Sequence, residues 1–450
     1  MSALRLICSL GPLCAAGALP SIRAEDPFQP PARLVGRTYN SGFADAHDTY
    51  NGMGCASNGR IYYVLSSERF DVGAQMFSFD PSTQSIQRIA DLTEACGEKG
   101  KHTIVQGKSH VNFVEAEAKL YFATHIGYYS IIDGMEKMGL PPAGWTRYPG
   151  GHLLAYDYIS GDFADLGLAP EGEGILSMNM DTRRGRIFGL TWPSGHFFRY
   201  DLARSDWKNF GRFAELGEAG QGAKYRTLCR SIAVNLADGS AWFSVANGDL
   251  YRYDRDADQV ALVRGEDLRK DYLGLYDPTS PGHMGYNWRQ TFYREADRMI
   301  YGVHGNSGYL FRLDPARPRL EVLERLTSQV SKRSGMYDQF SYGYLGFAPG
   351  PDGRKIFYLT GGPIYQDGRR VAGKNSTAMG EAKGLENLHL ITYDIPTNTY
   401  RDHGAIFYEN GQRPLYVNSI AVGLDETVYF LARITEGGRT RTDLVSVRAN

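Results

Sequence analysis

The residues of this sequence whose types suggest chemistry begin with two histidines, His110 and His125. His110 follows the polar run Gln106 to Ser109, and His125 directly follows the apolar stretch Lys119 to Thr124, which has the composition of a β-strand. If neighbouring strands hold both rings at one ligand, one imidazole can act as a base and the other as an acid. The pair could instead bind a metal ion or form structural hydrogen bonds, but we favour a functional role.

Basic, aromatic and amide side chains recur at comparable places along the chain, where a predicted strand begins or ends. Carboxylates are nearly absent from those places. Arginine pairs with a carboxylate through parallel hydrogen bonds, and aromatic rings stack on sugar faces, so the set predicts a site for an acidic, ring-shaped ligand such as a uronate sugar. The candidate ligand contacts are Asn51, Lys108, Trp192, His196, Arg230, Arg289 and His304, and Tyr344 is a further catalytic candidate.

His196 belongs to a duplicated motif, which complicates its interpretation. His152 ends Pro149-Gly150-Gly151-His152, and His196 ends the similar Pro193-Ser194-Gly195-His196. Each motif is followed by an apolar strand that ends in Tyr-Asp. Duplication at equivalent positions favours a structural role, such as tying a loop to a strand, and His196 is also kept among the candidate ligand contacts.

A repeated strand pattern must position these residues. Seven times the chain repeats a short apolar and aromatic strand, and a following strand often ends in Tyr-Asp, where the Asp is expected to cap a turn by accepting backbone N–H bonds. Radial repetition of this kind predicts an all-β fold, a seven-bladed β-propeller. The second strands of the repeats are predicted at Ile61–Val64, Leu120–Ala123, Ile187–Leu190, Ala241–Ser244, Ile300–Val303, Ile356–Leu359 and Val428–Leu431.

The last repeat, residues 418–450, runs out after a third strand near Leu444 to Val447. A propeller ring must close, so we expect Arg33 to Tyr39 to supply the missing outer strand from the other end of the chain. Two long insertions, Gly127 to Gly150 and Gly362 to Glu386, are predicted as loops over one face.

Propeller geometry predicts which residues meet. The innermost strands begin at one mouth of the central channel, and the connections after the second strands open on the same face. Counting back and forward from each second strand therefore places one set of side chains at that mouth, and the capping aspartates at the opposite side or the periphery. The mouth set contains His110, His125, Arg230, Arg289 and Tyr344, and the opposite set contains Asp157, Asp201 and Asp254.

Composition and charge set outer limits. Residues 1–24 resemble a secretory signal peptide, so a periplasmic or secreted protein is expected, with residues 25–450 as one domain and a monomer. The net charge of −1 gives no general attraction to nucleic acid or to membranes. Cys55, Cys96 and Cys229 allow at most one disulfide. The sequence has no P-loop, dinucleotide fingerprint, zinc-type spacing or nucleophile elbow.

The run Gly107-Lys108-Ser109-His110, leading through Lys119 to Thr124 into His125, resembles the propeller polysaccharide lyases of the ulvan lyase and rhamnose-glucuronate lyase type. In that group two histidines of one blade, with a tyrosine and an arginine of the next blades, cleave the bond to a uronic acid by β-elimination. The resemblance implies that His110 and His125 are the histidine pair.

The sequence departs from that pattern in the third repeat, which offers Ser177 to Met180 and Trp192 to His196 where a tyrosine and an arginine are expected. Arg230 or Arg289 would then bind the carboxylate, and Tyr286 or Tyr344 would supply the hydroxyl.

Two other functions stay open. A related propeller scaffold hosts rhamnosidases, although glycoside hydrolysis normally needs two facing carboxylates, which the predicted mouth lacks. A non-catalytic sugar-binding propeller is the other alternative. The expected partner is an acidic polysaccharide or oligosaccharide. No cofactor is required by the predicted chemistry, and a divalent cation on the propeller axis stays open without a recognisable ligand set.

Overall fold

The computed structural model describes residues 33–47, 50–132, 135–270, 273, 284–305, 307–329, 332, 346–362, 364–366, 369–371, 387–417 and 419–449. The predicted signal peptide, Tyr344 and most of the second insertion lie outside these residues.

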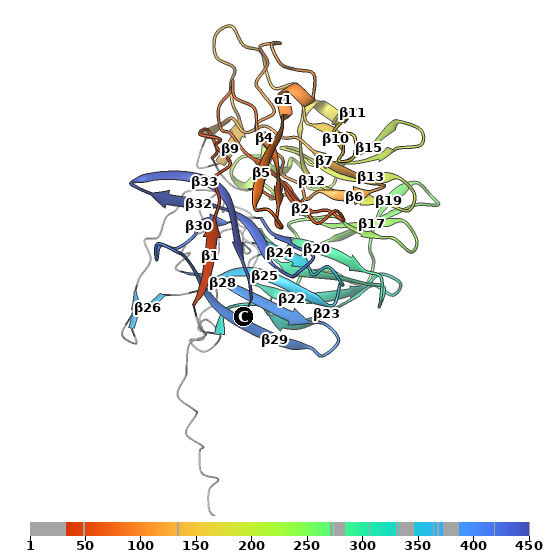
Figure 1. Ribbon diagram of the computed structural model, residues 1–450. Helices are drawn as coiled ribbons and strands as arrows, with labels where there is room; N and C mark the ends of the chain where they lie inside the picture. Colours follow the sequence, from red (N-terminus) through yellow and green to blue (C-terminus); the bar gives the residue numbers. More distant parts are fainter. Residues whose placement is uncertain are drawn as a thin grey trace, which may run out of the picture. The chain divides into compact units, whose positions relative to one another are not determined.

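The described residues form an all-β protein of small antiparallel sheets (Figure 1). Five sheets have four strands each, and in each sheet the strands lie side by side in the order in which they occur along the chain. Their strands are β2 (Met53–Cys55), β3 (Ile61–Leu65), β4 (Gln75–Asp80) and β5 (Ser85–Asp91); β6 (Val114–Ala116), β7 (Lys119–Ala123), β10 (His152–Asp157) and β11 (Phe163–Leu168); β12 (Gly174–Asp181), β13 (Arg186–Trp192), β14 (His196–Asp201) and β15 (Asp206–Arg212); β16 (Ala233–Asn235), β17 (Ser240–Ser244), β18 (Leu250–Asp254) and β19 (Gln259–Leu262); and β20 (Trp288–Arg294), β21 (Met299–His304), β22 (Tyr309–Asp314) and β23 (Arg319–Arg325).

A sixth sheet has nine strands among the described residues and contains two arrangements joined edge to edge, one of four strands and one of five, in which the short strands β30 and β31 both pair with β32. The first is β24 (Gly346–Pro349), β25 (Lys355–Gly362), β28 (Asn387–Asp394) and β29 (Thr399–Tyr408). The second is β30 (Leu415–Val417) with β31 (Ala421–Val422), β32 (Val428–Glu436), β33 (Arg439–Val447) and β1 (Leu34–Thr38). The strand cores predicted from the repeat are therefore confirmed.

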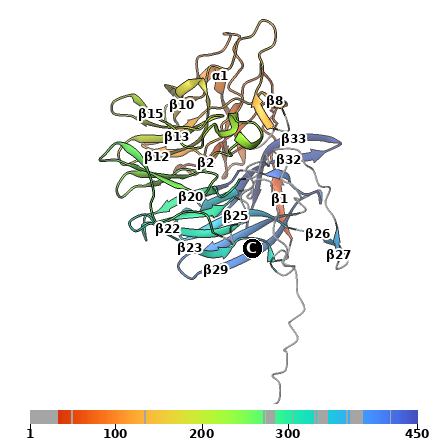
Figure 2. The ribbon, with the colours of Figure 1, turned by 180° about the vertical axis from the view of Figure 1, so that it is seen from behind.

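Strand β1 closes the last of these arrangements. It pairs antiparallel with β33, placing Arg37 opposite Ser446 and Thr38 opposite Val445, and parallel with β29, placing Leu34 opposite Ile406. The predicted pairing of the segment Arg33 to Tyr39 with the last strand is confirmed. β1 is drawn in red among the blue strands of the C-terminal part in both views (Figures 1 and 2).

Two hairpins interrupt the four-stranded pattern. β8 (Tyr129–Ile132) pairs with β9 (Met135–Met138), and β26 (Ile364–Gln366) pairs with β27 (Arg369–Val371). The prediction that residues 127–150 are only loop is wrong, because Tyr129 to Ile132 is an aromatic and β-branched run that forms a strand. The Gly and Pro residues that suggested a loop flank this hairpin.

Helix is scarce in the described residues. The helical elements with described bounds are a four-residue α-helix, α1 (Leu92–Ala95), and three 3₁₀ turns, η1 (Pro170–Gly172), η2 (Gly217–Ala219) and η3 (Gly222–Lys224). No described helix has the length and apolar character needed to cross a membrane. Cys55, Cys96 and Cys229 are free thiols.

The predicted turn caps are present at the ends of the third strands. The Asp157 carboxylate accepts backbone N–H bonds from Ile159 and Ser160, at 2.9 and 3.1 Å. The Asp254 carboxylate accepts equivalent bonds from Asp256 and Ala257, both at 3.0 Å. These aspartates have a structural role, because each satisfies turn N–H groups that the sheet leaves unpaired.

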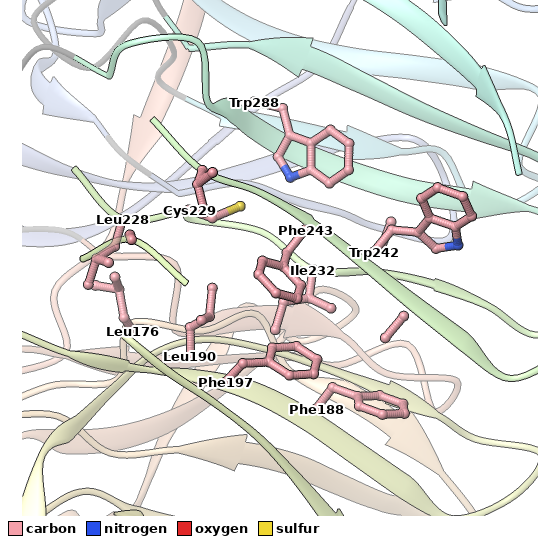
Figure 3. Close-up of a cluster of buried hydrophobic side chains, with 14 of the residues drawn as sticks. Leu176, Phe188, Leu190, Phe197, Leu228, Cys229, Ile232, Trp242, Phe243 and Trp288 are labelled. Carbon is pink, nitrogen blue, oxygen red and sulfur yellow. The ribbon is translucent and has the colours of Figure 1, made fainter. Parts of the chain in front are cut away.

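Aromatic side chains of adjacent sheets pack face to face and form the core (Figure 3). Phe197 on β14 stacks on Phe243 on β17 with ring centroids 4.5 Å apart. On the opposite face of the same sheet, Gly189 on β13 makes room for the Phe198 ring, since a Cβ there would lie 2.3 Å from it. The Phe197 cluster includes Leu176, Trp192 and Leu228, so the packed interior extends to the residues that hold the site described below.

The closure by β1 gives a testable prediction of stability. Leu34 is 2% exposed and packs in a cluster with Ile406 and Val445, whereas its neighbour Val35 is 63% exposed. We expect Leu34→Ala to lower the free energy of unfolding by about 2–4 kcal/mol, and the matched variant Val35→Ala to change it by less than about 0.5 kcal/mol. Urea denaturation measures both, and equal stability of the two variants would contradict a closing role for β1.

Candidate functional site

A small pocket gathers basic, imidazole and phenol groups from several sheets. Its open space has a volume of about 40 Å³. A water molecule needs roughly 10–15 Å³ of such space, so the pocket holds a group the size of a carboxylate but not a whole sugar ring. The described lining residues are Tyr50, Lys108, His110, His125, Tyr129, Glu136, Leu176, Trp192, Glu218, Arg230, Arg289 and Tyr416.

A short backbone bridge positions the two histidines. The Lys108 N–H donates to the His125 carbonyl at 3.0 Å, and the His125 N–H donates to the Lys108 carbonyl at 2.8 Å. This bridge places the end of β7 beside the segment that carries His110, and the two imidazole centroids lie 5.7 Å apart. Gly174 allows the close approach, because a Cβ there would lie 2.9 Å from His125 Cγ.

Backbone carbonyls determine the tautomer of both rings. His110 Nδ1 lies 2.8 Å from the Leu176 carbonyl oxygen, and His125 Nδ1 lies 2.9 Å from the Ile126 carbonyl oxygen. Because a carbonyl oxygen only accepts, each Nδ1 carries the hydrogen and each neutral ring has its lone pair on Nε2. Nε2 of His125 is buried and has no hydrogen-bond partner among the described residues.

Burial and neighbouring charge keep both imidazoles neutral. Desolvation lowers the pKa of His110 well below its ordinary value, and Lys108 lowers it further. Desolvation and Lys108 likewise lower the pKa of His125. Burial raises the pKa of the Tyr129 phenol well above its ordinary value. At neutral pH the pocket therefore presents two basic Nε2 atoms and a protonated phenol.

Tyr129 and Trp192 form a wall beside His125. The Tyr129 hydroxyl donates to the Ile126 carbonyl at 2.7 Å and lies 3.4 Å from His125 Nδ1. The Trp192 ring lies 5.3 Å from the His125 ring and meets the Tyr129 ring edge to face at 5.5 Å. The phenol thus belongs to the same cluster as the imidazole.

Three cationic side chains lie with the histidines in the pocket lining. Lys108 Nζ lies 3.6 Å from the centroid of the Tyr50 ring, a cation–π contact. Arg230 Nη1 pairs with Glu218 at 2.6 Å. Arg289, at the start of β20, is 1% exposed.

Glu218 organises the wall opposite β7. Its carboxylate accepts hydrogen bonds from Trp192 Nε1 at 2.9 Å and from the Leu228 N–H at 3.0 Å, besides pairing with Arg230. Lys137 of β9 donates to the backbone carbonyls of Glu218 and Gly220 at 2.6 and 2.9 Å. The hairpin β8–β9 is thereby fixed to the turn that holds Glu218.

Six of the residues selected from the sequence line this one pocket. They are Lys108, His110, His125, Trp192, Arg230 and Arg289. The predicted common face for His110, His125, Arg230 and Arg289 agrees with this arrangement, while Tyr344 lies outside the described residues.

Three other candidates do not line the pocket. Asn51 Nδ2 reaches the His110 carbonyl at 3.5 Å, His304 Nδ1 lies 2.8 Å from Ser307 Oγ, and His196 Nδ1 lies 3.2 Å from Asn209 Oδ1. His196 begins a third strand, β14, and pairs with Arg212 of the fourth strand β15, so its ring turns toward the neighbouring outer strand. Tyr286, the other hydroxyl candidate, packs against the hydrophobic core.

The candidates chosen from predicted strand ends did not include six of the lining residues, Tyr50, Tyr129, Glu136, Leu176, Glu218 and Tyr416. Glu136 and Tyr129 come from the hairpin in the first insertion, and Glu218 comes from η2, so no count from a second strand samples them. The expectation that carboxylates are nearly absent concerned the strand ends, and the two carboxylates of the pocket come from other segments. The position of Tyr129 four residues after His125 was the one sequence signal available.

The described residues hold no group of three or more His, Cys, Asp or Glu side chains arranged to bind a metal ion. The described residues therefore offer no such ligand group for the divalent cation that the sequence left open.

A second histidine cluster supports the strand that ends in His125. His152 begins β10 and bonds Glu98 through Nε2 at 2.9 Å and Asp165 through Nδ1 at 2.9 Å. Its backbone N–H donates to Thr124 Oγ1 at 2.8 Å. The two carboxylates outweigh desolvation and raise the pKa of His152 to about 9. These contacts agree with the structural interpretation of His152, since they tie the segment after α1 to β10.

No protein-family model matches this chain, and no curated protein matches it. Among solved structures, the chain is similar to the crystal structure of the β-propeller domain of Cps50 (Swd1) from Myceliophteria thermophila, with a TM-score of 0.50 and 8% sequence identity over 92% of this chain and 99% of that chain. The likeness shows that this chain has a β-propeller fold.

The His152 cluster predicts a pH-dependent stability. Because folding raises the pKa of His152 from 6.5 to about 9, its stabilising effect is complete below pH 6.5 and is lost as the pH rises through 9. We expect His152→Gln to lower the free energy of unfolding by about 3 kcal/mol at pH 6, since Glu98 loses a buried partner, and by much less above pH 9. Urea denaturation across this range measures the difference, and a pH-independent difference would contradict the assignment.

Proposed function

We propose that this chain is a polysaccharide lyase that cleaves a uronic-acid-containing polysaccharide or oligosaccharide by β-elimination. The observation that carries the proposal is the pair of neutral imidazoles, His110 and His125, beside Lys108, Arg230 and Arg289 in one pocket. A uronate carboxylate suits the basic groups, and the acidic C5 proton of the same sugar suits a neutral imidazole base.

We further propose that the sheets are seven blades of the propeller. The count adds the five four-stranded sheets to the two arrangements in the nine-stranded sheet, taking β30 and β31, which both pair with β32, as one interrupted inner strand. In this arrangement β1 is the outer strand of the last blade and links it to β29 of the blade before. Secretion or a periplasmic location, with an acidic polysaccharide as partner, belongs to the same proposal.

The reaction assigns a task to each group. Nε2 of one imidazole takes the C5 proton of the uronate, and the C5–H electron pair forms the C4–C5 double bond. The C4–O bond breaks, and the leaving oxygen takes a proton from an acid. Negative charge that develops on the carboxylate is stabilised by the guanidinium groups and Lys108. The step needs no oxidant or reductant.

Tyr129 takes the hydroxyl role in this proposal in place of Tyr286 or Tyr344. Its phenol stays protonated at neutral pH and lies beside the His125 ring. A protonated phenol can donate to a leaving oxygen, and the second imidazole can do so once it holds a proton.

Glycoside hydrolysis is the second candidate, because Glu136 and Glu218 both line the pocket. The Glu218 carboxylate already accepts hydrogen bonds from Trp192 and Leu228 and pairs with Arg230, so its oxygens are engaged within the protein. Elimination is therefore favoured. The propeller neighbour carries no argument for either chemistry, and a non-catalytic sugar-binding propeller is the remaining alternative.

Incubation of the purified chain with a panel of uronate polysaccharides tests the proposal. Elimination creates an unsaturated uronate, which absorbs in the ultraviolet. New reducing ends without this absorbance would indicate hydrolysis, and binding without either signal would indicate a sugar-binding protein.

The assignment predicts the effects of three substitutions. His110→Ala and His125→Ala should each lower turnover by about two to four orders of magnitude, since each removes a proton-transfer group. Arg289→Ala should raise KM as well as lower kcat, because a carboxylate pairs with guanidinium before and during the reaction. Initial rates from ultraviolet absorbance measure all three effects.

His403→Ala serves as the matched control, because His403 lies on the outer strand β29 and bonds Thr392. We expect it to keep the activity of the unchanged chain. Full activity in a His110→Ala, His125→Ala double variant with a native circular dichroism spectrum would place the reaction elsewhere.

A further inference from the structure

We propose that this pocket binds a single carboxylate group together with one proton, and that the proton is taken up by the pair His110 and His125. The inference rests on the proposed function for its ligand class, a uronate. It adds that the acid of the reaction is created by the substrate when it binds.

The size of the pocket selects the group. Its open space of about 40 Å³ accommodates about three water-sized positions. A carboxylate has three heavy atoms and fits that space, while the sugar ring that carries it lies at the opening. The pocket therefore recognises the charged group of a uronate rather than its ring.

Hydrogen bonding between the carboxylate and the two rings favours uptake of a proton. Both Nδ1–H groups are already bound to the carbonyls of Leu176 and Ile126, so the neutral rings offer only Nε2 lone pairs to a ligand. An ionised carboxylate also offers only lone pairs. The two meet favourably when one proton stands between them, because it turns an Nε2 atom into a donor of a charge-assisted hydrogen bond. The buried Nε2 of His125, which has no partner in the described part of the chain, is the first candidate.

The charged side chains that face His110 and His125 carry more positive than negative charge. Positive charge comes from Lys108 on the same segment as His110, from Arg230 in the segment before β16, and from Arg289 on β20. Negative charge comes from Glu136 on the hairpin and Glu218 on η2. The phenols that also face the pair are those of Tyr50, Tyr129 and Tyr416.

This excess of positive charge disfavours a metal cation and favours an anion. It also disfavours imidazolium in the empty pocket, where burial and Lys108 lower the pKa of both histidines. A bound carboxylate reverses the local field, which raises the pKa of the adjacent ring and allows it to take a proton. Ligand and proton therefore bind cooperatively.

The coupling connects recognition to catalysis. Elimination needs one neutral imidazole as base and one protonated group as acid, whereas the empty pocket holds two neutral rings. The negative charge of a bound uronate favours protonation of one of the two rings and so creates the acid. A neutral sugar of the same shape carries no such charge and does not. A neutral sugar would therefore bind more weakly, and even when bound it would leave the pocket without the protonated group that elimination needs.

Titration calorimetry of the full chain with sodium D-glucuronate tests the inference without any catalysis. Heats measured at pH 7.5 in HEPES and in Tris, which differ in ionisation enthalpy and avoid a phosphate anion that would compete for the pocket, give the number of protons exchanged. We expect uptake of about one proton per glucuronate bound, and weakening of the Kd by up to about tenfold per pH unit between pH 7 and 9. Methyl glucoside, which lacks the carboxylate, should not bind.

Two variants locate the proton. The double variant His110→Gln, His125→Gln should bind glucuronate with no proton uptake, while Arg289→Gln should bind it more weakly and retain the uptake. Binding of glucuronate without proton uptake by the unchanged chain would overturn the inference. Absence of glucuronate binding at tens of millimolar, or binding of a divalent cation to the pair in its place, would overturn it as well.

Failure of the inference and failure of the proposed function give different results. Proton-coupled glucuronate binding without unsaturated product from any uronate polysaccharide would sustain the inference and contradict the lyase. Unsaturated product from a chain that binds glucuronate without proton uptake would sustain the lyase and contradict the inference.

Discussion

The carbonyl oxygens of Leu176 and Ile126 decide what the pocket can do, because they hold the Nδ1 hydrogens of His110 and His125. With the other tautomer each ring would present a donor, and the site would be an ordinary anion receptor. With the tautomer observed, each neutral ring presents a base. The antiparallel bridge between Lys108 and His125 then fixes the distance between the two rings, so backbone geometry determines both the orientation and the chemistry of the pair.

A cluster of cations beside two buried imidazoles has an energetic cost, and the surrounding contacts offset part of it. Glu218 pairs with Arg230 inside the protein, and Lys108 lies over the ring of Tyr50. Charges that are already desolvated and held in place interact strongly with charge that develops on a ligand. The packed aromatic layers of the propeller, which extend to Leu176 and Trp192, keep these groups in place.

Most of the fold was predictable from the sequence because the repeats share the same short sequence pattern. An apolar and aromatic strand, a turn and a strand that ends in Tyr-Asp are local features, and their register locates the strand ends that carry His110, His125, Arg230 and Arg289. The capping role of Asp157 was also predictable, since its carboxylate binds the backbone of residues two and three positions later in the chain.

The rest of the pocket depends on contacts between segments that are distant in sequence. Glu136 and Glu218 reach the pocket through a hairpin and a 3₁₀ turn, and Lys137 joins these two elements through backbone carbonyls. Positions counted from the predicted second strands do not include residues of such segments. His196 shows the opposite error: it stands at a strand end, but that end belongs to a third strand, and its side chain meets Asn209 of the outer strand.

Proton NMR of the reaction products tests the central claim, that an imidazole of this pocket removes the C5 proton of a uronate. In a digest of a uronate oligosaccharide, the account predicts loss of the H5 signal of the cleaved residue and the appearance of a vinylic H4 signal in equal amount. Products that retain H5 at the new chain end would contradict it.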